Sequence, residues 1–207
     1  MDFKKWEPVY EAILEDFGFS KEDDQNAANI LSHLLIGPNT TSTDVLEELI
    51  SGKDVLVCGN APTLAQELDQ VKIEDHVVIA ADGATATLVD KGIIPAVIVT
   101  DLDGDVEKEI QANQEGSIAV IHAHGDNIEQ ILKYVPRFNK IIGTTQAKPF
   151  SNIYNFGGFT DGDRCVFLAG EFNATSITLA GFDFDDENVT EMKHKKLGWA
   201  KNLLGVL

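Results

Sequence analysis

The sequence predicts an α/β fold with a Rossmann-like, mostly parallel sheet that carries helices on both faces, preceded by a helical extension. Three observations predict this fold. After about residue 52, short apolar runs rich in β-branched residues alternate with segments of helical periodicity. The runs are apolar throughout, as are strands of a parallel sheet that is covered on both faces. Glycine and aspartate follow most of these runs, at the strand ends where α/β proteins bind ligands.

The first fifty residues are expected to be helical. Apolar side chains recur at helical spacing between Trp6 and Phe17. A second helical pattern follows Ser20, which suits an N-cap, and a third precedes the first apolar run. We therefore divide the chain into an N-terminal helical segment, 1–52, and an α/β domain, 53–207.

Within the α/β part, the apolar runs are expected to be strands and the periodic segments between them helices. A basic helix is expected to end the chain. The expected strand segments are 54–60, 76–83, 96–105, 117–127, 140–145 and 176–184. The expected helices between them are 61–71, 84–92, 106–116 and 128–135.

Composition narrows the classes of partner and compartment. The formal net charge of −18 argues against duplex DNA or an anionic membrane surface as a partner, because both attract basic proteins. No run approaches the roughly 20 apolar residues that cross a bilayer, and the acidic N-terminus lacks a signal-peptide core, so we expect a cytoplasmic protein. Cys58 and Cys165 lie far apart in apolar runs and are expected to be small buried residues rather than a disulfide.

The segment TDLDGD places Asp101, Asp103 and Asp105 at every second position after an apolar run. In an extended segment Asp101 and Asp103 point to the same side, and converging carboxylates suit a hard divalent cation. Mg²⁺ fits better than Ca²⁺, because the EF-hand pattern requires a glutamate where Ala112 stands. Mg²⁺ completes its shell with water and phosphate oxygens, so the segment points to a phosphorylated substrate. A solvated acidic turn is the alternative, and Asp105 is expected to cap the next helix.

The segment HAHGDN follows another expected strand. His124 and Asp126 are expected to line the crevice beyond the strand ends, and Gly125 would let the backbone approach a ligand. One alternative is a zinc site at His122 and His124, although no cysteine completes it at a recognisable spacing. The other alternative is a plain loop with a helix cap.

The segment CGNAPT, after the first expected strand, has two interpretations of equal weight. Gly59 and Asn60 would belong to an anion-binding turn whose backbone N–H groups face a phosphate or a ribose. Otherwise the segment is an ordinary turn between a strand and a helix. It contains no dinucleotide-binding or P-loop glycine pattern.

Aromatic and basic residues near the C-terminus suggest a slot for a flat heterocycle and a phosphate contact. Four aromatic residues, Phe150, Tyr154, Phe156 and Phe159, stand just before the polar residues Asp161, Asp163 and Arg164. The aromatic residues would either face such a slot or belong to the core. Arg164, one of two arginines in the chain, would bind phosphate or form a salt bridge at a helix start. The C-terminal lysines Lys193, Lys195 and Lys196 would face solvent or reach a phosphate.

Three segments in this order, DGATATLVDKGIIPAVIVTDLDGD, HAHGDN and GGFTDGDRCVFLA, resemble the archaeal 6-hydroxymethyl-7,8-dihydropterin pyrophosphokinases. That family is related to the catalytic domain of thiamin pyrophosphokinase. The resemblance covers most of the chain from about Asp54. It implies a fold like that catalytic domain and a Mg²⁺-dependent transfer of diphosphate from ATP to the hydroxymethyl group of a pterin. It also implies a place in the synthesis of tetrahydromethanopterin or folate-type cofactors.

The resemblance carries over residue by residue. Asp101 and Asp103 match the metal-binding pair of the family, and Asp82 and Asp126 match the neighbouring acidic positions. We expect Asp126 to be a further metal ligand or the base for the hydroxyl group, and Arg164 or a C-terminal lysine to hold phosphates. The residues expected around ATP are Gly59, Asn60, Asp82, Gly83, His124, Gly125, Asp161 and Asp163.

Three other functions stay open from the sequence. Thiamin pyrophosphokinase is the nearest, but the chain ends soon after AGFDFDD and so lacks the second, all-β domain of that enzyme. A methyltransferase that uses S-adenosylmethionine would not need a divalent cation, and a nucleotide sensor would bind ATP without turnover. Apolar faces on the N-terminal helices would allow a homodimer.

Overall fold

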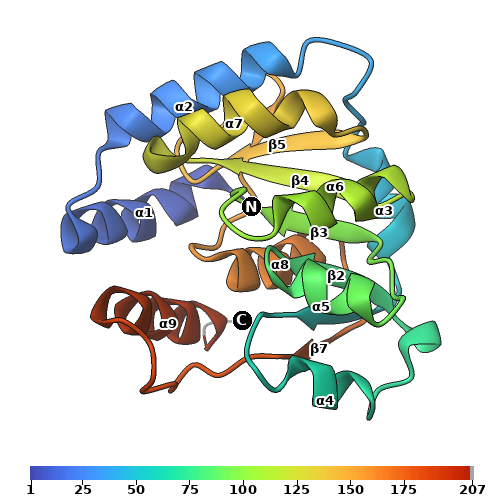
Figure 1. The fold of residues 1–207 in the computed structure, drawn as a ribbon. Helices are drawn as coiled ribbons and strands as arrows, with labels where there is room; N and C mark the ends of the chain where they lie inside the picture. Colours follow the sequence, from blue (N-terminus) through green and yellow to red (C-terminus); the bar gives the residue numbers. More distant parts are fainter. Residues whose placement is uncertain (206–207) are drawn as a thin grey trace.

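The computed structural model describes residues 1–205, which form an α/β fold around a seven-stranded sheet (Figure 1). Every pairing between neighbouring strands is parallel, and the strand order is β6-β5-β4-β3-β2-β1-β7. This confirms the predicted fold class, and each of the six expected strand segments contains a strand. The two-residue β6 was not predicted. The strands are β1 (Asp54–Cys58), β2 (Val77–Ala81), β3 (Val97–Thr100), β4 (Ile118–Ala123), β5 (Ile141–Thr145), β6 (Ile153–Tyr154) and β7 (Ser176–Ala180).

Helices cover both faces of the sheet, because successive strand residues point to opposite faces and both sets are apolar. Val55 and Val57 of β1 pack with α3 and α8, whereas Leu56 and Cys58 pack with α4 and α5. The α-helices are α1 (Phe3–Phe17), α2 (Lys21–Leu34), α3 (Asp44–Ile50), α4 (Leu64–Leu68), α5 (Ala84–Asp90), α6 (Val106–Gln114), α7 (Ile128–Tyr134), α8 (Asp161–Glu171) and α9 (Glu191–Leu204). Short 3-10 helices are η1 (Ile73–Asp75), η2 (Gly125–Asn127) and η3 (Val135–Arg137).

Capping residues set where the N-terminal helices begin and end. The side chain of Ser20 accepts a hydrogen bond from the Asp23 N–H and so caps α2, as predicted. Gly18 ends α1 in the left-handed conformation, with φ 70°. Ala27, Ala28 and Leu31 of α2 pack in one cluster with residues of β4 and β5. The first strand begins at Asp54, beside the boundary expected from the sequence.

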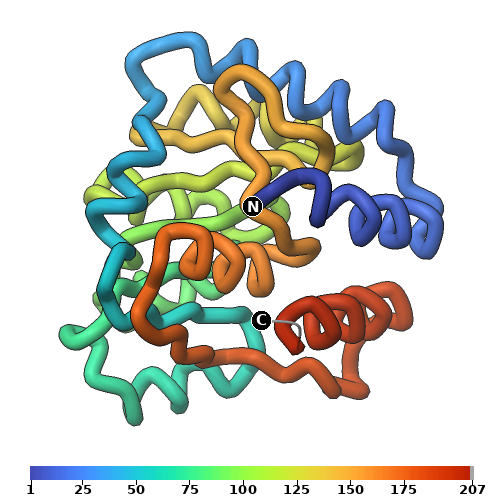
Figure 2. The backbone as a smooth tube through the Cα atoms, turned by 180° about the vertical axis from the view of Figure 1, so that it is seen from behind, coloured from blue at the N-terminus to red at the C-terminus, as the bar shows by residue number. Residues whose placement is uncertain are grey.

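Helices α1 and α9 are far apart in sequence but lie on the same side of the molecule, as Figures 1 and 2 both show. Both pack against α8, in a cluster that contains Trp6, Phe167 and Leu203. The Lys195 ammonium forms an ion pair with Asp16 at 2.9 Å, which ties α9 to the end of α1. Neither Cys58 nor Cys165 forms a disulfide, and both are buried, as predicted. Within residues 1–205 no helix combines the length and apolar character that crossing a membrane requires.

Candidate active site

A cavity of about 440 Å³ lies at the carboxyl ends of the parallel strands, bounded also by the α1–α2 connection, the start of α8, and α9. This is where ligands bind in α/β sheets, and its volume suits small-molecule substrates. All but one of the site residues expected from the sequence line this cavity. They are Gly59, Asn60, Asp82, Gly83, Asp101, Asp103, His124, Gly125, Asp126, Asp161 and Arg164.

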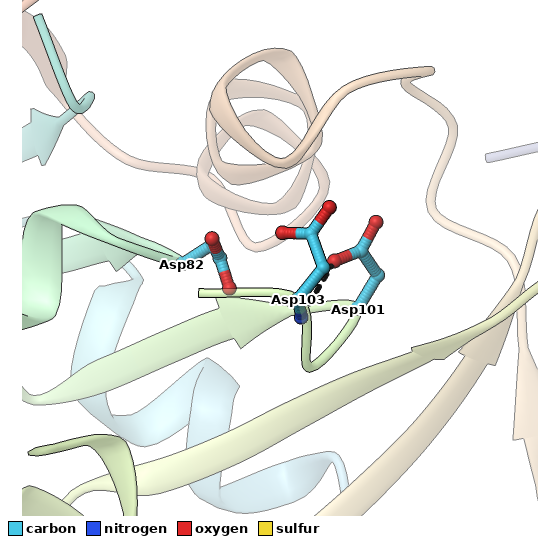
Figure 3. Close-up of side chains that lie close together, drawn as sticks. All are labelled: Asp82, Asp101 and Asp103. Carbon is cyan, nitrogen blue, oxygen red and sulfur yellow. Dashed lines mark hydrogen bonds between the residues drawn. The ribbon is translucent and has the colours of Figure 1, made fainter. Parts of the chain in front are cut away.

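Three carboxylates meet in this cavity. One oxygen each from Asp82, Asp101 and Asp103 lies within 4.8 Å of the others (Figure 3). Asp101 and Asp103 were expected to meet because they share one side of an extended segment, but β3 ends at Thr100 and a turn follows. Leu102 has φ 69° and its side chain is buried, so the turn directs the aspartates on either side of it towards the cavity.

The position of Asp82 is fixed by the turn after β3. The Thr100 hydroxyl donates to Asp82 Oδ1 at 2.9 Å, and the Gly104 N–H donates to the same oxygen at 3.2 Å. Asp82 itself has φ 40°, a conformation that is uncommon outside glycine and that aspartate adopts more readily than most residues. A Cβ at residue 104 would lie 2.5 Å from Asp82 Oδ2, so only glycine lets this backbone approach the carboxylate.

The charges of the cluster are unequal. Burial alone would raise the pKa of Asp101, but the hydrogen bond and charge of His124, helped by Arg164, lower it to about 2. Burial and the charges of Asp101 and Asp82 raise the pKa of Asp103 to about 7. Asp101 is therefore ionised at neutral pH, whereas burial and repulsion favour the protonated form of Asp103. A bound divalent cation would relieve the repulsion.

Glu109 of α6, which was not predicted, adds a fourth carboxyl group behind the cluster. It is 0% exposed, and neither of its carboxyl oxygens has a hydrogen-bond partner among the described residues. Burial and the charge of Asp82 raise its pKa well above the usual range, which favours the protonated form. A sequence signal existed, because Glu109 shares one helical face with Val106, Ile110 and Asn113, which are also buried.

The HAHGDN segment supports the aspartate cluster. His124 Nε2 lies 3.3 Å from Asp101 Oδ2. Asn127 donates from its side chain to the carbonyl oxygens of Asp101 and His122, at 2.8 and 2.7 Å, and so fixes the segment beside the turn after β3. Within residues 1–205 the aspartate cluster is the one group of three or more potential metal ligands, so the zinc alternative has no support.

The start of α8 contains one predicted site residue that does not line the cavity. Asp163 accepts hydrogen bonds from the N–H groups of Phe159 and Thr160, at 2.6 and 2.7 Å, and from the Thr160 hydroxyl. It is therefore a buried helix cap rather than an ATP contact. Arg164 lines the cavity and donates to Asp161 and to Gln146, at 3.2 and 3.3 Å.

The structure does not favour an anion-binding turn at CGNAPT. The N–H groups of Gly59 and Ala61 donate to the carbonyl oxygens of Ala180 and Gly181, both at 2.8 Å. Two of its backbone donors are therefore used to join the end of β1 to the end of β7. The Asn60 side chain still lies against Gly83 at the cavity edge.

The aromatic segment before α8 supplies fewer cavity-lining residues than predicted, and aromatic residues elsewhere in the chain line the cavity instead. Of the four aromatic residues expected at a heterocycle slot, Phe159 lines the cavity, whereas Tyr154 and Phe156 are partly buried and pack against the core. Phe19, Phe182 and Phe184 line the cavity and were not predicted. Lysines 193 and 196 of α9 reach it as well, in agreement with the phosphate-binding alternative for that helix.

Comparison with known proteins identifies relatives over nearly the whole chain. The family model described as 6-hydroxymethylpterin diphosphokinase MptE-like matches residues 28–189. A Methanocaldococcus jannaschii protein is 41% identical over 231 aligned residues, which cover 100% of this chain and 96% of the relative. A Pyrococcus furiosus protein is 41% identical, covering 99% and 93%, and a Methanothermobacter thermautotrophicus protein is 42% identical, covering 90% and 80%. All three relatives are named 6-hydroxymethyl-7,8-dihydropterin pyrophosphokinase.

Proposed function

The chain belongs to the MptE-like 6-hydroxymethylpterin diphosphokinase family, and from this premise we propose that it transfers diphosphate from ATP to 6-hydroxymethyl-7,8-dihydropterin. As a member of that family it is a diphosphokinase. The products would be AMP and the pterin diphosphate. The reaction would serve the synthesis of tetrahydromethanopterin or folate-type cofactors.

One observation carries the proposal: three carboxylates lie within 4.8 Å of one another at the strand ends, inside the cavity. The donors are all hard oxygens, and burial together with their mutual repulsion raises the pKa of Asp103, so the residues present fit Mg²⁺. Asp82, Asp101 and Asp103 would hold the ion. When bound, Mg²⁺ would neutralise charge on phosphate oxygens of ATP and so favour attack at the β-phosphorus. Asp126 lines the cavity outside this group of three.

The protein's own residues would bind and orient the two substrates. Arg164, 7% exposed, and the lysines at 193 and 196 would hold phosphate oxygens. The hydroxymethyl oxygen forms a bond to the β-phosphorus while the bond from that phosphorus to the oxygen bridging the α-phosphate breaks, and AMP leaves with the electron pair. Asp126 would accept the proton of the hydroxyl group.

Phosphorus NMR of the purified protein with ATP, Mg²⁺ and 6-hydroxymethyl-7,8-dihydropterin tests the proposal. We expect AMP and a pterin diphosphate to appear together, and neither to form when EDTA replaces Mg²⁺. Formation of ADP would contradict attack at the β-phosphorus. Turnover of thiamin but not of the pterin would contradict the proposed acceptor.

A further inference from the structure

We propose that the pterin ring occupies the end of the cavity formed by the α1–α2 connection, between Phe19 and Phe159, with its 2-amino and N3–H groups donating to Asp23. This inference rests on the proposed function and assigns the pterin, one of its two substrates, to one end of the cavity. It gives the N-terminal helices a direct role in acceptor recognition.

Strand order divides the cavity into two ends. The metal-binding aspartates follow β2 and β3, near the middle of the sheet. Gly125 and Gln146 follow β4 and β5 on one side of them, whereas Asn60 and Phe182 follow β1 and β7 on the other. ATP and its acceptor must both reach the central aspartates, so each substrate takes one end.

The first turn of α2, directly after the α1–α2 connection, is firmly attached to the β4–β5 end. Asp24, 3% exposed, accepts hydrogen bonds from the Tyr10 hydroxyl at 2.8 Å, the Gln146 side chain at 2.8 Å and the Gly125 N–H at 2.9 Å. A Cβ at Gly125 would lie 2.7 Å from the Asp23 Cβ, so glycine permits the close contact between α2 and η2. This end of the cavity is therefore built before any substrate binds.

The same end offers aromatic surface and a free carboxylate. Phe17 lies 5.3 Å from Phe19 and 5.0 Å from Phe159 between ring centroids, so it holds the two rings that line the cavity. Asp23 is exposed and lines the cavity, and its carboxylate has no hydrogen-bond partner among the described residues, whereas the Asp24 carboxylate already has three. A pterin presents adjacent N3–H and 2-amino donors that match two oxygens of one carboxylate.

At the β1–β7 end the acidic side chains already have hydrogen-bond partners within their own loop. The Asp183 and Asp186 side chains each accept a hydrogen bond from a nearby N–H group of their own loop, at 3.1 and 2.8 Å. Lys193 and Lys196 line the cavity from α9, the helix that follows β7 in the chain, and within residues 1–205 no ion pair involves either of them. Both cations are therefore available to the polyphosphate of ATP, so we assign the nucleotide to the β1–β7 end and leave the β4–β5 end to the pterin.

The test is a set of binding measurements on the full chain by equilibrium dialysis, with the pterin and ATP measured separately. We expect Asp23→Asn and Phe19→Ala to weaken pterin binding about tenfold to a hundredfold, because a hydrogen bond to a charged group or a stacked ring is lost. ATP binding should stay within about twofold of wild type. Glu22→Gln, an exposed neighbour that does not line the cavity, is the matched control and should bind both ligands normally.

A pterin analogue with an oxo group in place of the 2-amino group separates recognition from a structural effect. The wild type should prefer the pterin over this analogue, and Asp23→Asn should lose most of that preference while circular dichroism stays unchanged. Pterin binding that survives both Asp23→Asn and Phe19→Ala, or that is lost selectively in Phe184→Ala, overturns the assignment. A wild type that binds no pterin would instead overturn the proposed function as well.

Discussion

We expect Asp24→Asn to lower the free energy of unfolding by about 3 kcal/mol, because this carboxylate joins several parts of the chain. Its Oδ2 accepts from the Tyr10 hydroxyl and the Gln146 side chain, and its Oδ1 accepts from the Gly125 N–H. Burial and the Asp24 charge keep the pKa of Tyr10 well above its usual value, so its hydroxyl stays a donor. Asp24 is buried, and water therefore cannot replace a lost partner.

The magnitude follows from the bonds that an asparagine retains. In Asp24→Asn the amide oxygen takes the place of Oδ1 and still accepts from the Gly125 N–H. The amide nitrogen takes the place of Oδ2 and cannot accept from the Gln146 side chain, because both groups are donors. The Tyr10 hydroxyl can rotate and accept from that nitrogen. One bond is therefore lost and two become neutral, and bonds to a charged group contribute about 1.5–3 kcal/mol against about 1 kcal/mol for neutral ones.

Urea unfolding followed by circular dichroism measures this change, provided that the slope of the transition is the same for both proteins. Asp23→Asn, at the exposed neighbouring position, should lie within about 0.5 kcal/mol of wild type. A double-mutant cycle with Tyr10→Phe should give a coupling of about 1 kcal/mol or more. An Asp24→Asn midpoint equal to that of wild type would refute the reasoning, because the carboxylate would then not hold α1 and α2 in place.

Further predictions concern the cluster and its neighbours. Asp101→Asn should lower kcat/KM more than about 100-fold and weaken Mg²⁺ binding measured by calorimetry, whereas Asp105→Asn, which retains the helix cap, should leave both near wild type. The Mg²⁺ dissociation constant should fall as pH rises from about 6 to about 8, since a proton must leave Asp103, and Asp103→Asn should abolish that pH dependence. Asp163→Ala should lower the free energy of unfolding by about 2 kcal/mol in urea titrations without changing Mg²⁺ affinity; a large loss of Mg²⁺ affinity would show that Asp163 does more than cap α8.

The fold was predictable because its signals are local. Apolar β-branched runs predicted the strands that are buried on both faces. Ser20 and Asp105 were predicted to cap helices, and the structure confirms both caps. The two-residue β6 was missed since Ile153 and Tyr154 are too few to form a pattern. The CGNAPT turn was ambiguous for a related reason, because two of its N–H groups donate to Ala180 and Gly181, more than a hundred residues later.

The site was predictable only where the chain concentrates polar groups at strand ends. The aspartate pair of TDLDGD stood out, although its geometry depends on the left-handed Leu102 rather than on an extended segment. Asp24 carried no comparable signal, because its partners lie 14, 101 and 122 residues away along the chain. Glu109 could have been noticed as a buried position, since a single acid among the buried residues of one helical face is unusual. Its closeness to Asp82 could not, because Asp82 follows β2, a different part of the chain.

Strand order also separates the carboxylates proposed to hold Mg²⁺ from the end of the cavity proposed for the pterin. These carboxylates follow β2 and β3, each of which pairs with a strand on both sides, so their position depends on the most constrained part of the sheet. The first turn of α2 contacts the β4–β5 end through the Asp24 side chain. A change in this turn or in the connection before it would therefore reshape the proposed pterin end without moving the carboxylates. We accordingly expect substitutions at residues 19 and 23 to alter acceptor affinity while the Mg²⁺ affinity stays that of wild type.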